Sequence, residues 1–415
     1  MKALTLRALR GLDDRIHGLS RGDRRRVLFD GESLMHFAMF ETLTRALGLD
    51  DRIECRFTCS WDGGLKVPLA DVCRVLGLAP SAFTPYAQAK WKKWDLFISS
   101  CFDNPWFARN VPWADTFHGV GEKWVDGGER LYMCHPLAAR YDRLLCPNRR
   151  LAMQFEKHPA FLKSPQSLRV TGLARSDLLV WLNSPDIRGA LKGALGLQPD
   201  DRVVLFAPTW GREGLLARHA EDAIRACRDA GCQLLVKLHS CSYLADPAHN
   251  GGVDWRSRME EWSASYGFRH LPEANLVALM LAADAMVADF GSAPVEFCVL
   301  DRPLIFFNVP EQATRTGGDG FQFNALCAAG DAVTDIRGLA SALTRALAGN
   351  DRTALPRQRL REDFFHEPGA ATENSLVELY GMMSLEFPGD LGQRCRQNTI
   401  TSVLSAPHAF IGCEN

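Results

Sequence analysis

The sequence predicts an α/β protein with two doubly wound, Rossmann-like domains in tandem. The chain has 415 residues, which is more than one ordinary hydrophobic core accommodates. Short β-rich apolar runs alternate with amphipathic helical segments, a pattern typical of parallel sheets built from βαβ units. A polar stretch over residues 183–201, rich in Pro and Gly, marks the break between the two halves.

The first domain is expected over residues 26–190. It begins with a short apolar run that favours a strand, followed by a helical segment and further β-rich runs. The predicted strands are 27–30, 53–58, 95–100 and 114–117; the first helix is 33–47, and the segment 142–147 leads into a helical run that ends at Phe155.

The second domain is expected over residues 200–385, where the alternating pattern restarts. Its predicted strands are 202–208, 233–239, 285–289 and 303–308, and its clearest helices are 216–230 and 372–383. The tail, residues 386–415, lacks strong periodicity, so we expect part of it to be disordered.

Charge and cysteine content narrow the classes of function. The formal net charge is −1, so no overall positive field favours nucleic acid, and an anionic ligand requires a local cluster of cations. The 13 cysteines lack the spacing of a zinc finger. Their odd number fits a reducing cytoplasm better than a disulfide framework.

The N-terminal segment, residues 1–25, is basic and amphipathic, with four apolar residues at helical spacing between arginines. Two interpretations stay open. One is a helix on an anionic membrane surface, with contact through residues 1–26; the other is a short docking helix with a solvated basic face. Its charges break any secretory apolar core, and no apolar run in the sequence reaches the length that spans a bilayer.

Polar residues directly follow the predicted strands, the place where ligands bind in open parallel sheets. After the strand at 114–117 come His118, Gly119, Gly121 and Lys123. The glycines let the backbone approach a ligand, the N–H groups that follow favour an anion, and the lysine adds a charge. Taken alone, the histidine fits a structural turn as well. The missing third glycine excludes a dinucleotide fingerprint.

Two segments of the second half carry cations. Lys237 and His239 lie two residues apart, so on a strand they point to one face and suit a pyrophosphate; a solvated edge strand is the alternative. In A-P-T-W-G-R (207–212), Thr209 and Arg212 follow a strand and offer contacts to phosphate oxygens. The alternative is that the proline and glycine of this segment only shape a turn.

The segment A-D-F-G-S-A-P-V-E-F (288–297) closes a strand and opens a helix. Helix capping explains Ser292 as the N-cap, with Glu296 near the first turn, but it leaves Asp289 unexplained. A fifth polar loop carries Arg175. Five such loops spread over both halves indicate an enzyme that acts on a phosphate-bearing substrate.

Taken in order, these motifs resemble those of the CDP-glycerol glycerophosphotransferases, the teichoic-acid-type polymerases and primases. The resemblance spans residues 95–380 and implies a GT-B-like fold, in which two Rossmann-like domains face each other across a cleft. It is carried by H-G-V-G-E-K (118–123), C-P-N (146–148), G-L-A-R-S-D-L-L (172–179), A-P-T-W (207–210), K-L-H (237–239) and A-D-F-G-S-A-P-V-E-F-C-V-L-D-R-P-L-I-F-F (288–307).

The resemblance implies that a hydroxyl of a polymer or lipid-linked glycan acceptor attacks the β-phosphorus of a CDP-alditol, with CMP leaving. The family's histidines fall on His118, the expected base, and His239. The implied donor-binding residues are Arg175, Thr209, Arg212, Lys237, Asp289, Ser292 and Glu296, and the implied anion loop is Gly119, Gly121 and Lys123. No carboxylate cluster demands a metal, so no cofactor is assigned and a role for Mg²⁺ stays open. The expected location is the cytoplasm, with peripheral contact at the inner face of the plasma membrane.

Two alternatives stay open. A GT-B glycosyltransferase or 2-epimerase-like isomerase that uses a UDP-sugar would share the expected fold, and fold does not fix function. A non-catalytic scaffold in envelope-polymer synthesis would accommodate the departures from the family pattern at Ser240 and Gly291, although both histidines are retained.

Overall fold

The computed structural model describes residues 24–121, 135–244, 250–313 and 320–412. Lys123 and the N-terminal segment up to residue 23 lie outside the described residues. The chain divides into two compact units. The first comprises Met1–His118, Cys134–Asp177 and His366–Thr399, and the second comprises Gly119–Met133, Leu178–Phe365 and Ile400–Asn415. Residues 366–385, assigned to the second domain from the sequence, therefore fold with the first unit.

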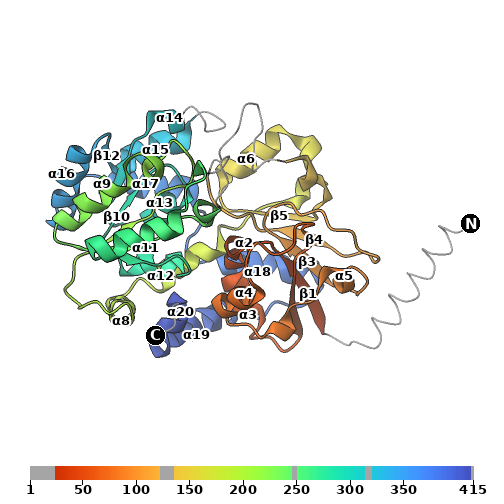
Figure 1. Ribbon diagram of the computed structural model, residues 1–415. Helices are drawn as coiled ribbons and strands as arrows, with labels where there is room; N and C mark the ends of the chain where they lie inside the picture. The colour runs from red at the N-terminus through yellow and green to blue at the C-terminus, as the bar shows by residue number, and fades with distance from the viewer. Residues whose placement is uncertain (1–23, 122–134, 245–249, 314–319, 413–415) are drawn as a thin grey trace, which may run out of the picture. The chain divides into compact units, whose positions relative to one another are not determined.

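A six-stranded parallel sheet forms the centre of the first unit, in the order β2-β1-β3-β4-β5-β6 (Figure 1). The four predicted strands are present, and the segment 142–147 contains a fifth strand. The sixth strand, β6, has three residues of intermediate burial, too few to give an alternating pattern. The strands are β1 Arg25–Asp30, β2 Ile53–Thr58, β3 Leu96–Ser99, β4 Trp113–Asp115, β5 Arg143–Cys146 and β6 Leu168–Val170.

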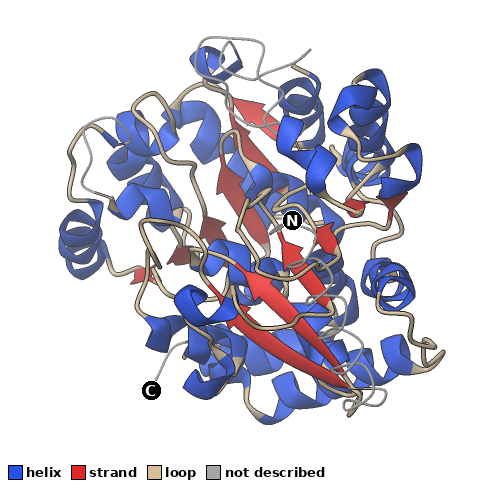
Figure 2. Cartoon of the chain, turned by 90° about the vertical axis from the view of Figure 1, so that its right-hand side faces the viewer, coloured by secondary structure: helices blue, strands red, loops and turns tan. Residues whose placement is uncertain are grey.

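The helices of the first unit flank this sheet (Figure 2). The helix predicted over 33–47 is two helices, which meet at Phe40. The α-helices are α2 Leu34–Met39, α3 Glu41–Leu47, α4 Leu69–Leu76, α5 Tyr86–Ala89, α6 Arg149–Lys157, α18 Ala371–Met382 and the start of α19 Leu391–Ser405. Short 3-10 turns are η1 Pro80–Ala82, η2 Pro136–Arg140, η3 Pro159–Phe161, η4 Pro165–Ser167 and η5 Ala174–Ser176, and α7 Asp177–Trp181 begins where the first unit ends.

The second unit has its own six-stranded parallel sheet, in the order β12-β11-β10-β7-β8-β9. Both edge strands escaped prediction because they have only two and three residues and little buried surface. The strands are β7 Val203–Phe206, β8 Gln233–Val236, β9 Arg269–His270, β10 Ala285–Ala288, β11 Leu304–Phe307 and β12 Asp331–Val333.

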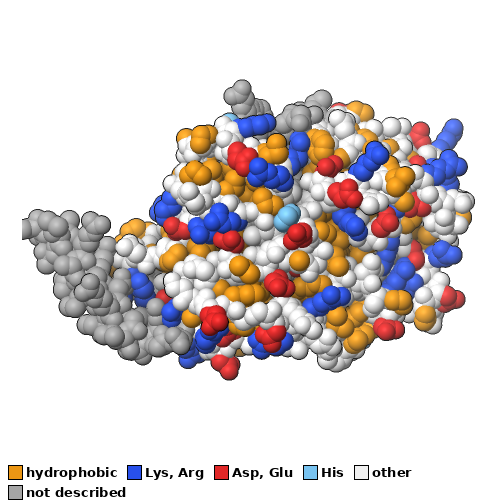
Figure 3. All heavy atoms as spheres, turned by 180° about the vertical axis from the view of Figure 1, so that it is seen from behind, with side chains coloured by type: hydrophobic (Ala, Val, Ile, Leu, Met, Phe, Trp, Pro, Cys, Tyr) orange, Lys and Arg blue, Asp and Glu red, His pale blue; other side chains and the backbone are white. Residues whose placement is uncertain are grey.

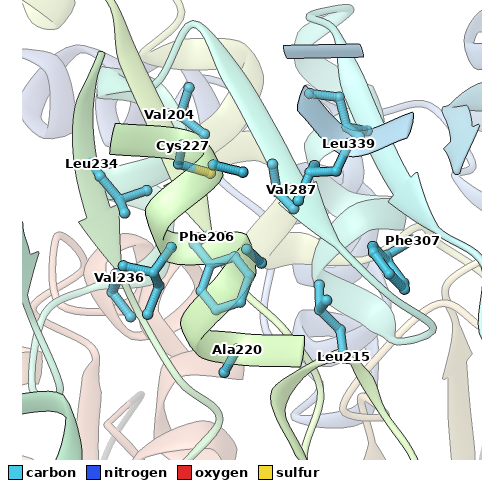
Figure 4. Close-up of a cluster of buried hydrophobic side chains, with 14 of the residues drawn as sticks. Val204, Phe206, Leu215, Ala220, Cys227, Leu234, Val236, Val287, Phe307 and Leu339 are labelled. Carbon is cyan, nitrogen blue, oxygen red and sulfur yellow. The ribbon is translucent and has the colours of Figure 1, made fainter. Parts of the chain in front are cut away.

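An apolar core joins this second sheet to its helices. In Figure 4, Phe206 and Val287 of two neighbouring strands lie beside Leu215 and Ala220 of α9 and near Leu339 of α16. The α-helices are α8 Pro185–Ala194, α9 Leu215–Asp229, α11 Trp255–Tyr266, α12 Leu276–Ala282, α13 Ser292–Phe297, α14 Pro310–Ala313, α15 Phe321–Ala329, α16 Ile336–Leu347, α17 Ala354–Phe364 and α20 Pro407–Ile411; the 3-10 turns are η6 Ser240–Tyr243 and η7 Cys298–Leu300.

The prediction of a partly disordered tail is wrong for its described residues, which form α19 and α20. Leu391, Cys395, Thr399 and Val403 are all buried. They recur every four residues and so lie on one helical face. The threonine and the cysteine weaken the apolar signal, which is why the periodicity was missed.

The surface carries charges of both signs. Figure 3 shows Lys and Arg interspersed with Asp and Glu over one face, in keeping with the net charge of −1. No helix among the described residues is long and apolar enough to cross a membrane. All the described cysteines are free thiols.

Candidate active site

In the first unit, three neighbouring strands bring chemically active side chains to the carboxyl edge of the sheet. His36 lies on α2 after β1, Cys101 follows β3, and His118 follows β4. One potential ligand atom of each lies within 4.8 Å of those of the other two. The two imidazole rings meet edge to face, with their centroids 5.8 Å apart. The position of His118 directly beyond a strand is as predicted, whereas His36 and Cys101 were not predicted.

His118 is buried and has a defined tautomer. Its Nδ1 lies 2.8 Å from the backbone carbonyl oxygen of Ser100, and only 8% of the residue is exposed. Because a carbonyl only accepts, this partner assigns the proton to Nδ1 and leaves a lone pair on Nε2. The exposed fraction is small, but a lone pair on Nε2 is what a general base requires.

Asp115 binds the backbone of two segments of this cluster, the one after Cys101 and the one before His118. Its buried carboxylate accepts hydrogen bonds from Ser99 Oγ at 2.6 Å, from Phe102 N at 2.9 Å and from Phe117 N at 2.8 Å. Both phenylalanines have left-handed backbone, with φ of 54° and 56°. Such conformations cost energy in non-glycine residues and persist only where the surroundings enforce them. Burial raises the pKa of Asp115 to about 6.

Two more carboxyl groups lie at this edge. Asp30 closes β1 and accepts hydrogen bonds from the backbone N–H and the hydroxyl of Ser60. Burial raises its pKa to about 6. Burial, with repulsion from Asp30 and Asp115, raises the pKa of Asp103 to about 8. Carboxyl groups are poor neighbours for a diphosphate and good hydrogen-bond partners for hydroxyl groups, so this edge suits a polyol acceptor.

The glycines after His118 belong to the second unit. A Cβ at Gly121 would overlap the side-chain amide of Gln322, so a larger residue there would displace that amide. Arg175 is buried in η5 of the first unit, whereas the other predicted donor-binding residues lie in the second. Lys123 lies outside the described residues.

In the second unit, Asp289 organises the loop that follows β7. It is buried and accepts hydrogen bonds from Thr209 N at 2.6 Å, Leu215 N at 2.8 Å and Gln312 Nε2 at 2.7 Å. Burial raises the pKa of Asp289 to about 6. A Cβ at Gly214 would lie 2.7 Å from its Oδ2. These contacts make Asp289 a positioning residue for the Thr209 loop.

His239 has the opposite tautomer to His118. Its Nδ1 accepts a hydrogen bond from the backbone N–H of Cys241 at 3.1 Å. The ring proton therefore resides on Nε2, which is a donor suited to a phosphate oxygen. The indole of Trp210 lies beside it, with ring centroids 6.2 Å apart. The loops after β7 and β8 thus meet at one edge.

The predicted strand 233–239 is too long, because β8 ends at Val236. Neither Lys237 nor His239 therefore lies in the strand. Nζ of Lys237 donates a hydrogen bond to the carbonyl oxygen of Pro272, in the loop after β9. The predicted strand is wrong at its end, whereas the shared direction of the two side chains stays a prediction.

The loop after β10 also differs from its prediction. Helix α13 begins at Ser292, so the N-cap position is Gly291, which makes no side-chain cap. Ser292 is partly exposed and Glu296 is buried in the helix. Gln322 Nε2 donates to the carbonyl oxygen of Gly291 at 3.0 Å. Arg212 is exposed on the Thr209 loop.

The residues that sequence reasoning missed carried usable signals. Cys101 and Asp30 lie at the ends of predicted strands, so the strand-end rule applies to them as it does to His118. His36 lies in a predicted helix and not directly after a strand, so the strand-end rule does not select it. Gln312 has no signal of its own, since only the fold brings it to Asp289.

The two parallel sheets, each with polar side chains at its carboxyl edge, define a doubly wound α/β protein of two units. The chain belongs to the CDP-glycerol:poly(glycerophosphate) glycerophosphotransferase family, whose model matches residues 135–378. That match includes His239 and the Asp289 loop; His118 precedes it.

Curated relatives agree with this membership. The chain is 28% identical over 177 residues to a teichoic acid glycerol-phosphate transferase of Staphylococcus aureus, covering 40% of this chain and 41% of the relative. It is 23% identical over 239 residues to a teichoic acid poly(glycerol phosphate) polymerase of Bacillus spizizenii, covering 52% and 56%. The chain thus spans about half the length of these relatives.

Solved structures confirm the GT-B-like α/β fold. The wall teichoic acid polymerase TagF superposes with a TM-score of 0.59 at 16% identity, over 94% of this chain and 93% of that one. The UDP-GlcNAc 2-epimerase of Neisseria meningitidis superposes with a TM-score of 0.53 at 12% identity, over 86% and 100%. At these identities the likeness concerns the fold alone.

Proposed function

We propose that this protein transfers an alditol phosphate, glycerol phosphate in the first place, from a CDP-alditol to a hydroxyl group of a teichoic-acid-like or surface-glycan acceptor, and releases CMP. Membership of the glycerophosphotransferase family supports the donor and the group transferred. The observation that carries the proposal is the pair of opposite tautomers, an accepting Nε2 on His118 and a donating Nε2 on His239.

His118 is the general base. In the proposed reaction, Nε2 of His118 takes the proton of the acceptor hydroxyl as its oxygen attacks the β-phosphorus of the donor. The bond from that phosphorus to the bridging oxygen breaks, and CMP leaves with the bridging oxygen. The carboxyl groups of Asp30 and Asp103 offer hydrogen bonds to the other hydroxyl groups of the acceptor.

His239 binds the diphosphate of the donor. Phosphoryl transfer depends chiefly on positioning and on stabilising charge. Nε2–H of His239 donates to a phosphate oxygen, with Thr209 and Arg212 offering further contacts from the loop after β7. Asp289 acts through that loop, because its hydrogen bonds fix Thr209 and Leu215.

Two features of the setting belong to the proposal as well. The reaction takes place in the cytoplasm at the inner face of the plasma membrane, which the free thiols of the described cysteines support. Residues 1–26, whose arginines suit anionic lipid, supply the membrane contact. Sedimentation of the full chain with anionic and with neutral vesicles tests the second point, and equal binding to both would contradict it.

A nucleotide panel tests the function itself. Thermal-shift titrations with CDP-glycerol, CDP-ribitol, CMP, UDP-GlcNAc and UDP should show stabilisation by the cytidine nucleotides, and CMP release should depend on an added polymer acceptor. Assays with and without EDTA and Mg²⁺ decide the metal requirement. Preference for uridine nucleotides would favour the UDP-sugar alternative. Donor binding without CMP release on any acceptor would favour a scaffold.

A further inference from the structure

We propose that His36, Cys101 and His118 form a binding site for Zn²⁺, and that an ion bound there blocks transfer by occupying Nε2 of the base. His36 comes from helix α2, and the other two residues come from the segments that follow β3 and β4 at the same sheet edge. Their ligand atoms lie within 4.8 Å of one another. The inhibitory part of this proposal rests on the proposed function, whereas the binding part does not.

The geometry suits one tetrahedral ion. With metal–nitrogen bonds of about 2.0 Å, two imidazoles on such an ion have their ring centres roughly 5 Å apart. The rings of His36 and His118 have centroids 5.8 Å apart and an interplanar angle of 78°. A side-chain adjustment of less than about 1 Å would therefore bring both rings onto the ion. Hydrogen bonds to Asp115 fix the backbone next to Cys101 and His118 in advance.

The ligand chemistry selects the metal. A thiolate with two imidazoles is a soft and borderline set that favours Zn²⁺ over Mg²⁺ or Ca²⁺, which prefer oxygen. Three protein ligands leave one position of a tetrahedral ion for water or a substrate oxygen. The site is therefore of the open kind, in which the fourth ligand exchanges, rather than a closed structural centre.

The hydrogen bond made by His118 resembles those that orient metal ligands. A ligating histidine usually donates its other ring N–H to a carbonyl or carboxylate oxygen, which fixes the tautomer. His118 does so through Nδ1 to Ser100 O at 2.8 Å. On His36, Nδ1 accepts a long hydrogen bond from Glu32 N at 3.4 Å and lies 3.4 Å from Ser33 Oγ. Contacts of this length are weak, so these two oppose a reorientation of the ring only slightly.

Ion binding and base catalysis compete for one lone pair. Nε2 of His118 cannot accept the acceptor's proton while it coordinates an ion, so occupancy of the site and transfer exclude each other. Free Zn²⁺ should then inhibit the enzyme reversibly, and a chelator should restore the rate.

Co²⁺ is the probe for the binding part, because it takes the same ligands and reports them in its absorption spectrum. The full chain is freed of metal with a chelator, dialysed and titrated with Co²⁺. One equivalent should give the visible bands of tetrahedral cobalt and a thiolate-to-cobalt band in the near ultraviolet, and Zn²⁺ should remove both. Absence of these bands would overturn the proposal.

Variants assign the ligands. Cys101→Ser should lose the thiolate band, and His36→Ala should weaken Co²⁺ binding by about tenfold or more. Cys59→Ser is the matched control, a partly buried cysteine that follows the neighbouring strand β2, and it should keep the wild-type spectrum. A thiolate band that persists in Cys101→Ser would overturn the assignment. If that variant fails to fold, His36→Ala carries the test.

The inhibition part is measured as CMP release with and without Zn²⁺, each variant being compared with its own metal-free rate. Wild type and Cys59→Ser should be inhibited over the same Zn²⁺ range that displaces cobalt, and Cys101→Ser should need about tenfold more Zn²⁺ or higher. Equal inhibition of all three would overturn this part. A cobalt site without any CMP release would leave binding standing and reject both the inhibition and the proposed function.

Discussion

The carboxylate of Asp115 accepts a hydrogen bond from the backbone N–H of Phe117 at 2.8 Å, one residue before His118. It accepts another from Phe102, one residue after Cys101, at 2.9 Å. Both phenylalanines have a left-handed backbone conformation, and their rings meet edge to face with centroids 5.4 Å apart. One buried carboxylate therefore sets the position of two loops at the candidate active site.

Replacing this carboxylate should affect stability and transfer together. An asparagine at position 115 presents an NH₂ group to one of the N–H donors, so Asp115→Asn should lower the free energy of unfolding by about 1–3 kcal/mol. CMP release should fall because His118 is displaced. Urea unfolding and the transfer assay measure the two effects.

Asp142→Asn is the matched control. Asp142 also accepts a backbone N–H, from Trp113 at 3.0 Å, but at the amino end of β4. It should lose some stability and keep its transfer rate. Wild-type behaviour of Asp115→Asn would contradict the role assigned to this carboxylate.

The opposite tautomers of the two histidines predict different kinetic defects. His118→Ala should lower transfer by about 10²- to 10⁴-fold, because it removes the base, and should leave donor affinity near the wild-type value. His239→Ala should weaken CDP-glycerol binding by about tenfold or more, because it removes a donor to a charged group. Calorimetry and CMP release separate the two. His158→Ala, at the C-terminal end of α6, is the control. Full turnover by His118→Ala would reject the base assignment.

Gly214 should not tolerate a methyl group. A Cβ there would lie 2.7 Å from Asp289 Oδ2 and 2.9 Å from Gln312 Nε2, so Gly214→Ala should displace the Thr209 loop and weaken donor binding. Gly189→Ala, within α8 and with no neighbour inside 4 Å, should instead stabilise the protein by about 0.5–1 kcal/mol. Thermal unfolding and donor titration compare the pair; equal behaviour would contradict the crowding at Gly214.

Asp103 should make stability depend on pH. Its pKa is about 8 in the folded protein against an ordinary 3.8, so between these values the folded state binds the proton more tightly than the unfolded chain. The stabilisation that the proton on Asp103 provides is complete below the ordinary pKa of 3.8 and is lost as the pH rises through the folded-state pKa of about 8. The urea concentration at the unfolding midpoint of wild type should therefore decrease as the pH is raised from about 6 to about 9. Asp103→Asn should make this decrease smaller. The exposed Asp363→Asn is the control, and an unchanged profile in Asp103→Asn would refute the assignment.

Much of the architecture could be read from the sequence because buried parallel strands are continuous apolar runs. V-V-L-F of β7 and L-I-F-F of β11 are both fully buried, and no polar residue interrupts them. The edge strands β9 and β12 could not be found, because a strand with one neighbour needs few apolar residues.

For the candidate site, the sequence predicts only which residues lie just beyond the end of a strand. His118 and Asp289 lie beyond strand ends, where the rule places them. Which ring nitrogen of His118 carries the proton depends on Ser100 O, and the direction of Lys237 depends on Pro272 O. Both partners are backbone carbonyl groups, which every residue has, so the sequence gives no sign of them.

The first unit is assembled from both ends of the chain. Glu378 of α18 binds Arg143 and Arg169, each at 3.0 Å, and Tyr380 Oη donates to Asp50 at 2.7 Å. A ribosome makes the strands of this sheet first and its helix α18 only after residues 178–365. At about 5–20 residues per second that interval is on the order of ten to forty seconds.

During this interval the first sheet lacks Leu376 and Leu379, which are buried in the finished protein. Most of the second unit, by contrast, is already outside the ribosome. The sheet that is translated first therefore waits for its helix α18 until most of the second unit has been made. Its uncovered apolar surface is the part of the nascent chain that chaperones should bind.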